Sequence, residues 1–265
     1  MTQEPRPAAF FDLDKTIIAM SSSSALSRPL LEGGLLTRTA ALRTGYAALL
    51  FHMGGADERK TNRLRDALTD LIRGWDVERL SEILDETLQE NIDPVVYLEA
   101  LELIEAHHNL GRDVVVVSAS AREVVEPIAR LLGADEVIAT EMEVENGLFT
   151  GGIKFYAFGE NKAVAMQALA AERGYDLDRS YAYSDSITDM PMLAVVGHGY
   201  AVNPDRALRN AALENGWGIL RFRRPVALRR TASPKSLALG AAIVAGVVVG
   251  VWLVSRTVRK RRGSL

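Results

Sequence analysis

The chain has 265 residues, enough for one substantial domain with an insertion or for two modest domains. It contains no cysteine, which excludes disulfides, thiolate catalysis and zinc–thiolate sites. The formal net charge of −3 leaves the charge of the substrate open, and the four scattered histidines suggest no metal cluster, so any bound metal should be a hard cation with oxygen ligands.

An apolar run predicts a buried strand over residues 8–12, which ends at two carboxylates, Asp12 and Asp14. Residues two apart on an extended segment point the same way, so both side chains can face one reaction centre. Two close like charges usually share a divalent metal or divide the work between a nucleophile and an acid/base. A strand that runs into an acidic turn is the simpler alternative.

Residues 22–92 carry helical patterns and little strand character. Apolar positions recur at three-to-four spacing over 40–53, 63–73 and 77–89, with glycines between these stretches. We therefore predict a helical insertion after the first strand. A helical pattern resumes over 94–108, where Pro94 suits the first turn.

After residue 94, predicted strands and helices alternate. We expect strands at 113–118, 137–140, 180–184, 199–202 and 219–222, and helices at 121–132, 162–172, 190–195 and 205–214. A hairpin over 143–154 turns at Asn146-Gly147, and Asn203-Pro204 precedes the last helix as its cap. This alternation predicts an α/β fold, a doubly wound, Rossmann-like parallel sheet made from residues 1–21 and 93–222.

The C-terminal region is unusually apolar. Residues 237–255 carry no charge and would span about 28 Å as a helix, close to the thickness of a bilayer core. We predict a single transmembrane helix there, with a buried core helix as the alternative, between a basic linker (223–236) and a basic tail (256–265). Gly246 and Gly250 could let two such helices approach closely and form a homodimer. The N-terminus shows no signal-peptide pattern, which favours a membrane-anchored protein with a cytoplasmic catalytic domain.

In open parallel sheets the functional site lies beyond the carboxyl ends of the strands. The polar residues predicted at that edge are Asp12, Asp14, Thr16, Ser118, Lys162, Asp185 and Asp189. This set of carboxylates with one lysine and a hydroxyl suits a magnesium ion and a phosphoryl group.

In these motifs the chain resembles the haloacid dehalogenase superfamily, and within it subfamily IB, the phosphoserine-phosphatase-like branch. The resemblance covers about residues 8–215. It rests on four motifs in the family's order: Asp12-Leu13-Asp14-Lys15-Thr16, Ser118, Lys162, and Asp185-Ser186-Ile187-Thr188-Asp189. Four such motifs in matching strand contexts outweigh the alternative of coincidental acidic turns, and the insertion 22–92 takes the position of the family's helical cap.

The resemblance implies a role for each site residue. Asp12 is the nucleophile that forms an aspartyl phosphate, and Asp14 is the general acid and base. Magnesium is held by the Asp12 carboxylate, by the backbone carbonyl of Asp14 and by Asp185, with Asp189 assisting in the second shell of ligands. Ser118 and Lys162 bind the phosphoryl oxygens, and Thr16 orients the first loop.

Two positions depart from the phosphoserine phosphatase pattern. Ser21 stands where those enzymes have the glutamate that binds the substrate amine, and Thr188 replaces an asparagine of the fourth motif. The chemistry survives both changes, while phosphoserine becomes doubtful as the substrate.

We therefore predict a magnesium-dependent phosphatase that acts on a small phosphorylated metabolite and has no nucleic-acid partner. Two alternatives remain open: a membrane-associated phosphatase of lipid or lysolipid phosphates, and a membrane-tethered regulatory protein without turnover.

Overall fold

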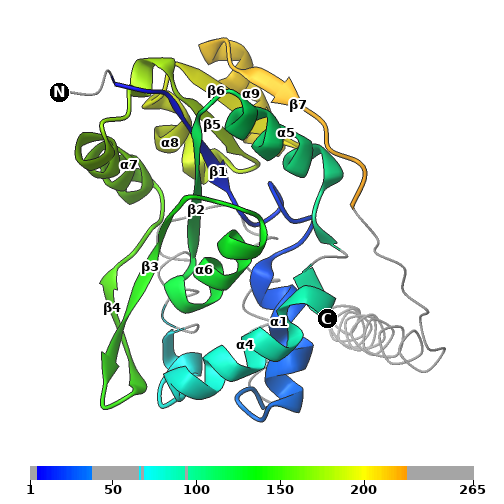
Figure 1. Cartoon of the computed structure of the whole chain (residues 1–265), viewed down its shortest axis with the longest axis vertical. Helices are drawn as coiled ribbons and strands as arrows, with labels where there is room; N and C mark the ends of the chain where they lie inside the picture. Colours follow the sequence, from blue (N-terminus) through cyan, green and yellow to red (C-terminus); the bar gives the residue numbers. More distant parts are fainter. Residues whose placement is uncertain (1–4, 38–65, 67–68, 93–94, 226–265) are drawn as a thin grey trace, which may run out of the picture. The chain divides into compact units, whose positions relative to one another are not determined.

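A seven-stranded sheet organises the computed structural model, which describes residues 5–37, 66, 69–92 and 95–225 (Figure 1). The strand order is β4-β3-β2-β1-β5-β6-β7. The strands are β1 (Ala8–Asp12), β2 (Asp113–Ala121), β3 (Glu136–Glu145), β4 (Leu148–Phe155), β5 (Tyr181–Ser184), β6 (His198–Val202) and β7 (Gly218–Leu220). All neighbours pair in parallel except β3 and β4. The predicted α/β sheet is thus confirmed, with an antiparallel strand added at one edge.

Helices cover both faces of this sheet, as a doubly wound fold requires. The helices α5 (Leu98–Asn109) and α6 (Arg122–Leu131) lie on one face, and α7 (Glu160–Arg173), α8 (Met190–Ala194) and α9 (Arg206–Asn215) on the other. Because side chains alternate along β1, Phe11 packs on the face covered by α5 and α6, and Phe10 packs on the opposite face. Both rings are fully buried, so β1 is the centre of the core.

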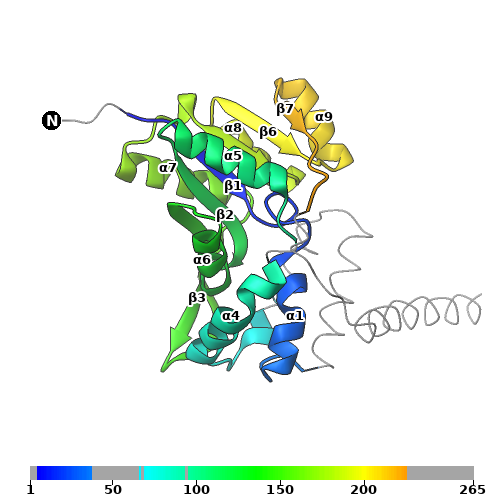
Figure 2. The same cartoon turned by 45° about the vertical axis from the view of Figure 1, so that its right-hand side comes forward.

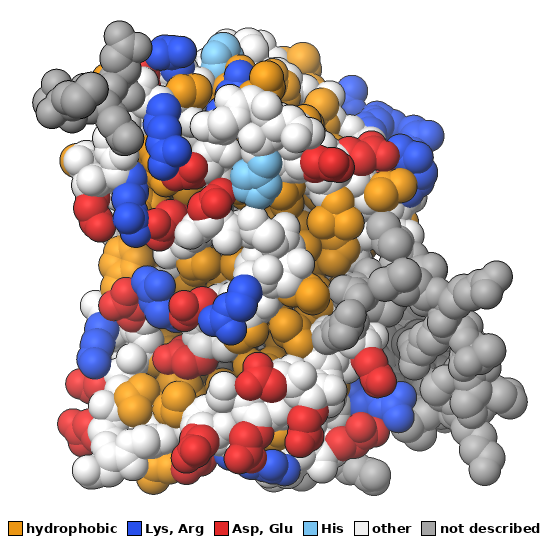
Figure 3. All heavy atoms as spheres, in the orientation of Figure 1, with side chains coloured by type: hydrophobic (Ala, Val, Ile, Leu, Met, Phe, Trp, Pro, Cys, Tyr) orange, Lys and Arg blue, Asp and Glu red, His pale blue; other side chains and the backbone are white. Residues whose placement is uncertain are grey.

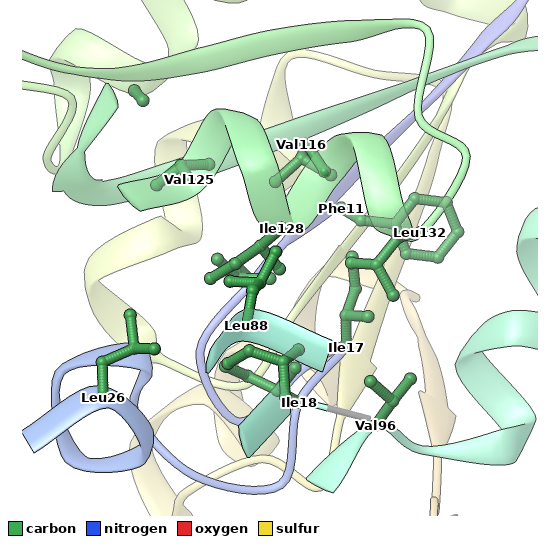
Figure 4. Packing of buried hydrophobic residues seen from close by; sticks show 14 of the residues in the cluster. Phe11, Ile17, Ile18, Leu26, Leu88, Val96, Val116, Val125, Ile128 and Leu132 are labelled. Carbon is green, nitrogen blue, oxygen red and sulfur yellow. The ribbon is translucent and has the colours of Figure 1, made fainter. Parts of the chain in front are cut away.

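The insertion after β1 contributes helices α1 (Ser22–Glu32) and α4 (Val77–Ile92), which lie together beside α6 (Figures 1 and 2). Leu26 of α1 and Leu88 of α4 join Ile128 of α6 in one buried cluster, seen from close by in Figure 4. This apolar contact packs the inserted helices α1 and α4, called the cap below, against the core. The helix predicted over 40–53 and part of that over 63–73 lie outside the described residues.

The outer surface of α4 is acidic. Red side chains gather over this part of the surface in Figure 3. The exposed acidic residues of α4 are Glu78, Glu82, Asp85, Glu86 and Glu90. The opposite stripe of the helix is buried against the cluster, so α4 is an amphipathic cap helix.

The chain enters and leaves the cap through two paired segments. The N–H of Ala19 donates to the carbonyl of Val95 (2.7 Å), and the N–H of Tyr97 donates to that of Ile17 (2.9 Å). Helix α5 therefore begins at Leu98, later than the predicted 94, because residues 95–97 hydrogen-bond to the outgoing chain. Pro94 itself lies outside the described residues.

The β3–β4 hairpin is longer than its sequence pattern indicated. It turns at Asn146-Gly147 as predicted, with positive φ values of 51° and 80°. Near the hairpin's end the N–H of Val77 donates to the carbonyl of Gly147 (3.0 Å), and that of Gly74 to the carbonyl of Phe149 (2.8 Å). The hairpin thus reaches beyond the core of the sheet and contacts the inserted segment that precedes α4. In this outer part of the hairpin, the sequence carries no pattern of buried apolar residues.

Local capping differs from the prediction at α9. The carboxylate of Asp205 accepts from the N–H of Leu208 (2.7 Å). Asp205 is therefore the N-cap residue of this helix, rather than the preceding Asn203-Pro204.

In the described part of the chain, no helix has the length and the apolar composition needed to cross a membrane. The predicted span 237–255, with Gly246 and Gly250, and the tail 256–265 lie outside that part. Residues 223–225, expected to open the basic linker, hydrogen-bond to the start of α5. The N–H groups of Arg223 and Arg224 donate to the carboxylate of Glu99 (3.0 and 3.2 Å).

Candidate active site

Strand register places the predicted motifs at one edge of the sheet. Asp12 is opposite Val117 on β2, and Phe11 is opposite Tyr183 on β5. Ser118 and Ser184 are therefore adjacent to the end of β1, one on each side. The structure thus juxtaposes the first, second and fourth motifs, as the parallel-sheet prediction required.

A buried ionic network occupies this edge. The ammonium of Lys162, in the first turn of α7, donates to Asp12 Oδ1 (2.7 Å) and to Asp189 Oδ2 (2.8 Å). The hydroxyl of Ser184 donates to the same Asp189 oxygen (2.7 Å). Asp12, Lys162 and Asp189 are 6%, 2% and 3% exposed. One cation between two carboxylates fixes the orientation of Asp12 in a site almost closed to water.

The pKa values reflect this burial. Desolvation raises the pKa of Asp12 well above its ordinary value, and Asp189 and Asp185 add to the rise while Lys162 opposes it. Burial alone would lower the pKa of Lys162, but the attraction of Asp12 and Asp189 outweighs it, and the net pKa is raised. The lysine is thus held charged. Burial also raises the pKa of Asp185 to about 6, although Lys15 opposes the rise.

Asp14 lies beside this network in different surroundings. Its Oδ1 accepts the backbone N–H of Ser22 (2.7 Å), and its Oδ2 faces the hydroxyls of Ser22 (3.3 Å) and Ser120 (3.5 Å). Burial raises the pKa of Asp14, and the hydrogen bonds from Ser22 oppose that rise. Lys15, which follows, has a left-handed backbone (φ 63°) that turns the chain away after Asp14. Asp14 therefore lies among hydrogen-bonding groups that contain hydroxyls and an N–H rather than an ammonium.

The donor set fits a hard divalent cation. Asp12, Asp14, Asp185 and Asp189 bring four carboxylates to an edge where Lys162 is the buried cation. Among the described residues, no Lys or Arg forms an ion pair with Asp185. No three side chains in this part of the chain form a ready-made metal site. A cation here would therefore need a backbone carbonyl as well as carboxylates, which is the ligand set that the family resemblance implies for Asp14.

The remaining predicted residues occupy the same edge. Ser118 is 1% exposed, and its Oγ accepts the N–H of Ser120 (3.2 Å). Thr16 is fully buried, and its Oγ1 has no hydrogen-bond partner in the described residues. Its predicted orienting role therefore stays a prediction.

Three contact residues were missing from the predicted set: Ser22, Ser120 and Ser184. Ser184 directly precedes Asp185 and Ser120 is two residues after Ser118, and this proximity to predicted motif residues is the signal that could have found them. Ser22 has no such signal, because it lies within a run of serines and reaches Asp14 only through the turn into α1.

The two departures from the phosphoserine phosphatase pattern have local structural roles. Ser21 is the N-cap of α1, and its Oγ accepts the N–H of Ser24 (3.3 Å) and contacts the Ser24 hydroxyl (2.7 Å). The hydroxyl of Thr188 contacts that of Ser186 (3.0 Å). Neither position offers a carboxylate to a substrate amine.

The sheet order, the cap inserted after β1 and the carboxylates at the strand ends define a Rossmann-like hydrolase with an inserted cap. The chain belongs to the haloacid dehalogenase-like hydrolases, whose family model matches residues 9–194. The family prediction made from the four motifs is thereby confirmed.

Relatives of known name are similar along most of their length. The chain is 53% identical to the "inhibition of morphological differentiation protein" of Streptomyces azureus, over 95% of this chain and 94% of that one. It is 52% identical to a protein named a probable phosphatase of Mycobacterium tuberculosis (91% and 85%). A protein of the same bacterium named a phosphoserine phosphatase is 36% identical (89% and 77%).

Solved structures show the same fold. A Bordetella pertussis protein of unknown function matches with a TM-score of 0.71 at 28% identity, over 82% of this chain and 98% of its own. A substrate-bound phosphoserine phosphatase matches with a TM-score of 0.59 at 18% identity, over 84% and 95%. These structures show the shared fold, and the relatives named as phosphatases agree with the phosphoserine-phosphatase-like branch.

Proposed function

We propose that this protein is a magnesium-dependent phosphomonoester hydrolase that works through an aspartyl phosphate on Asp12. The observation that carries the proposal is the pair at the end of β1. Asp12 is held by the buried ammonium of Lys162, while Asp14 is held among hydroxyls and one N–H. Two neighbouring carboxylates in such different surroundings suit a nucleophile and an acid/base.

In the first step, a carboxylate oxygen of Asp12 bonds to phosphorus, and the bond from phosphorus to the ester oxygen breaks. Asp14 gives its proton to that departing oxygen. In the second step, Asp14 takes a proton from water as the water oxygen bonds to phosphorus, and the aspartyl phosphate breaks. Orthophosphate leaves, and both carboxyls return to their starting states.

Lys162 and Ser118 would bind the phosphoryl oxygens. An ammonium has three donors, and Lys162 gives two of them to Asp12 and Asp189. The third donor remains for the phosphoryl group. Ser118, one residue beyond the partner of Asp12 on β2, brings a hydroxyl to the same edge.

The residues that would hold magnesium are the Asp12 carboxylate, the Asp14 carbonyl and Asp185, with Asp189 behind them. The ion would supply positive charge for the phosphoryl oxygens and offset the excess of carboxylates.

For the substrate we propose a small phosphorylated metabolite other than phosphoserine. The name of one relative supports a small phosphoester. Ser21 caps a helix where an amine-binding glutamate would be needed, which speaks against phosphoserine itself. No described contact favours a lipid phosphate, and the complete set of site carboxylates speaks against a regulator without turnover.

The location remains a proposal made from the sequence. The uncharged segment 237–255 supports a C-terminal membrane anchor with the catalytic domain on the cytoplasmic side. Membrane fractionation of the full chain and of a chain ending at residue 235 tests it. The anchor is refuted if both forms stay in the supernatant.

Hydrolysis of p-nitrophenyl phosphate by the full-length protein tests the activity. We expect phosphate release that requires Mg²⁺ and disappears in Asp12→Asn. A panel of phosphoserine, sugar phosphates and lysophosphatidate then tests the substrate class. Preferential turnover of lysophosphatidate would contradict a small metabolite, and absence of turnover by folded protein on every substrate would contradict the hydrolase.

A further inference from the structure

The cap supplies direct contacts to the carboxyl of Asp14. Ser22, the first residue of α1, is 1% exposed and reaches Asp14 with both its N–H and its hydroxyl. The Ser22 hydroxyl also contacts the hydroxyl of Ser120 (3.0 Å). Ser120 lies on β2, two residues after Ser118, and its own hydroxyl faces Asp14. The Asp14 side chain is thus held between the cap and strand β2 of the core.

The start of α1 is built so that this contact can form. Ser21 is extended (φ −74°, ψ 141°) and caps the helix by accepting the N–H of Ser24. The N–H of Ser22 is one of the first-turn donors that have no partner within a helix. It is directed to Asp14 Oδ1 at 2.7 Å.

The two oxygens of Asp14 consequently differ. An N–H can only donate, so Oδ1 is held as an acceptor by the helix backbone. Among the described residues, the hydrogen-bond partners of Oδ2 are the hydroxyls of Ser22 and Ser120, and a hydroxyl can rotate to donate or to accept. Oδ2 can therefore carry a proton or lose it without leaving a neighbour unpaired.

We propose that Ser22 and Ser120 are positioning residues that fix the Asp14 carboxyl so that Oδ2 transfers the proton. The inference rests on the proposed function. In the first step the proton on Oδ2 goes to the ester oxygen as its bond to phosphorus breaks. In the second step the attacking water returns a proton to Oδ2. Because Ser22 belongs to the cap, the acid/base is correctly placed only when the start of α1 is seated on the core.

Substrates that differ in their leaving group test this role. Phenol, with a pKa of about 10, needs a proton as it leaves, whereas p-nitrophenolate is stable without one. The parameter kcat/KM reports steps up to phosphoryl transfer, so it isolates the first proton transfer. The ratio of kcat/KM for the two aryl phosphates is therefore the readout.

Three variants and one control are compared in the full chain. Ser22→Ala removes one hydroxyl and keeps the N–H, and Ser120→Ala removes the other hydroxyl. Ser22→Pro also removes the N–H; proline is accepted at the first helical position, and the extended Ser21 suits a following proline. Ser23→Ala, at the exposed neighbouring position, is the control. Circular dichroism and Tm establish folding for each.

We expect kcat/KM for phenyl phosphate to fall about 10-fold in Ser22→Ala and Ser120→Ala and about 100-fold in Ser22→Pro. For p-nitrophenyl phosphate we expect a fall below about 3-fold, and for Ser23→Ala no change on either substrate. Equal losses on both substrates, or no loss in either alanine variant, would overturn the positioning role. The alanine variants decide the matter even if Ser22→Pro fails to fold. If the wild-type protein cleaves neither ester, the proposed function falls as well, whereas activity lost in Asp12→Asn leaves that function standing whatever the ratio shows.

Discussion

The two aspartates at the end of β1 are two residues apart, yet different parts of the molecule hold them. Asp12 is tied to Lys162 and, through it, to Asp189, all from the core and all buried. Asp14 is held by Ser22 of the cap and Ser120 near the end of β2, through one backbone N–H and two hydroxyls. The half of the site that would bond to phosphorus is fixed by charge within one rigid sheet edge. The half that would exchange protons depends on a second structural element.

The sharpest test of this contrast removes the proposed nucleophile, Asp12. Asp12→Asn keeps the shape of the side chain but cannot form an aspartyl phosphate, so we expect kcat to fall at least about 1,000-fold. Phosphate release from p-nitrophenyl phosphate measures it. Residual activity above about a tenth of wild type would show that Asp12 is not the nucleophile.

The next largest effect is expected when Lys162, the cation that holds Asp12, is removed. Lys162→Met leaves Asp12 and Asp189 facing each other in a buried site, which we expect to lower the free energy of unfolding by about 3–5 kcal/mol as well as to abolish turnover. Urea denaturation measures the stability. The exposed Lys154→Met is the matched control, with an expected change below about 0.5 kcal/mol. Equal stability of the two variants would contradict the proposed importance of the buried network.

The pH dependence of stability tests Asp185, which is proposed to bind the metal. The pKa of Asp185 is raised to about 6 from 3.8, so the folded state binds more protons in between. Its contribution to stability is present at low pH and is lost as the pH rises through 6, a loss of about 3 kcal/mol. Without metal, the stability of wild type relative to Asp185→Asn should therefore fall from pH 4 to 7.

This comparison needs the variant because His107 acts in the opposite direction. Burial lowers the pKa of His107 to about 4, and its contribution to stability is lost as the pH falls. We further expect Mg²⁺ to raise the Tm of wild type at pH 7 more than at pH 4.5, and not to raise that of Asp185→Asn. A magnesium shift of equal size at both pH values would argue against a carboxylate site.

The smallest expected effect is that of a single hydrogen bond from a neutral hydroxyl to the Asp189 carboxylate. Ser184→Ala removes the hydroxyl that donates to Asp189 (2.7 Å), and we expect a loss of about 1–2 kcal/mol in unfolding free energy with kcat reduced less than about 10-fold. Ser27→Ala, whose hydroxyl bonds only within α1, should change stability by less than about 0.5 kcal/mol. A larger loss of activity in Ser184→Ala than in Lys162→Met would reverse the assigned order.

The sequence by itself determined the sheet, the family and the residues that surround Asp12 at the ends of the strands. Strand and helix periods are local patterns, and parallel strands bring their carboxyl ends together whatever follows, so Asp12, Ser118 and Asp185 could be placed at one edge from their positions alone. Only the tertiary structure decided how Asp14 is held, why α5 begins at Leu98 and where the β3–β4 hairpin ends. Each of these depends on backbone groups that find partners far away in the chain, and a serine or an N–H carries no mark in the sequence of the partner it will meet.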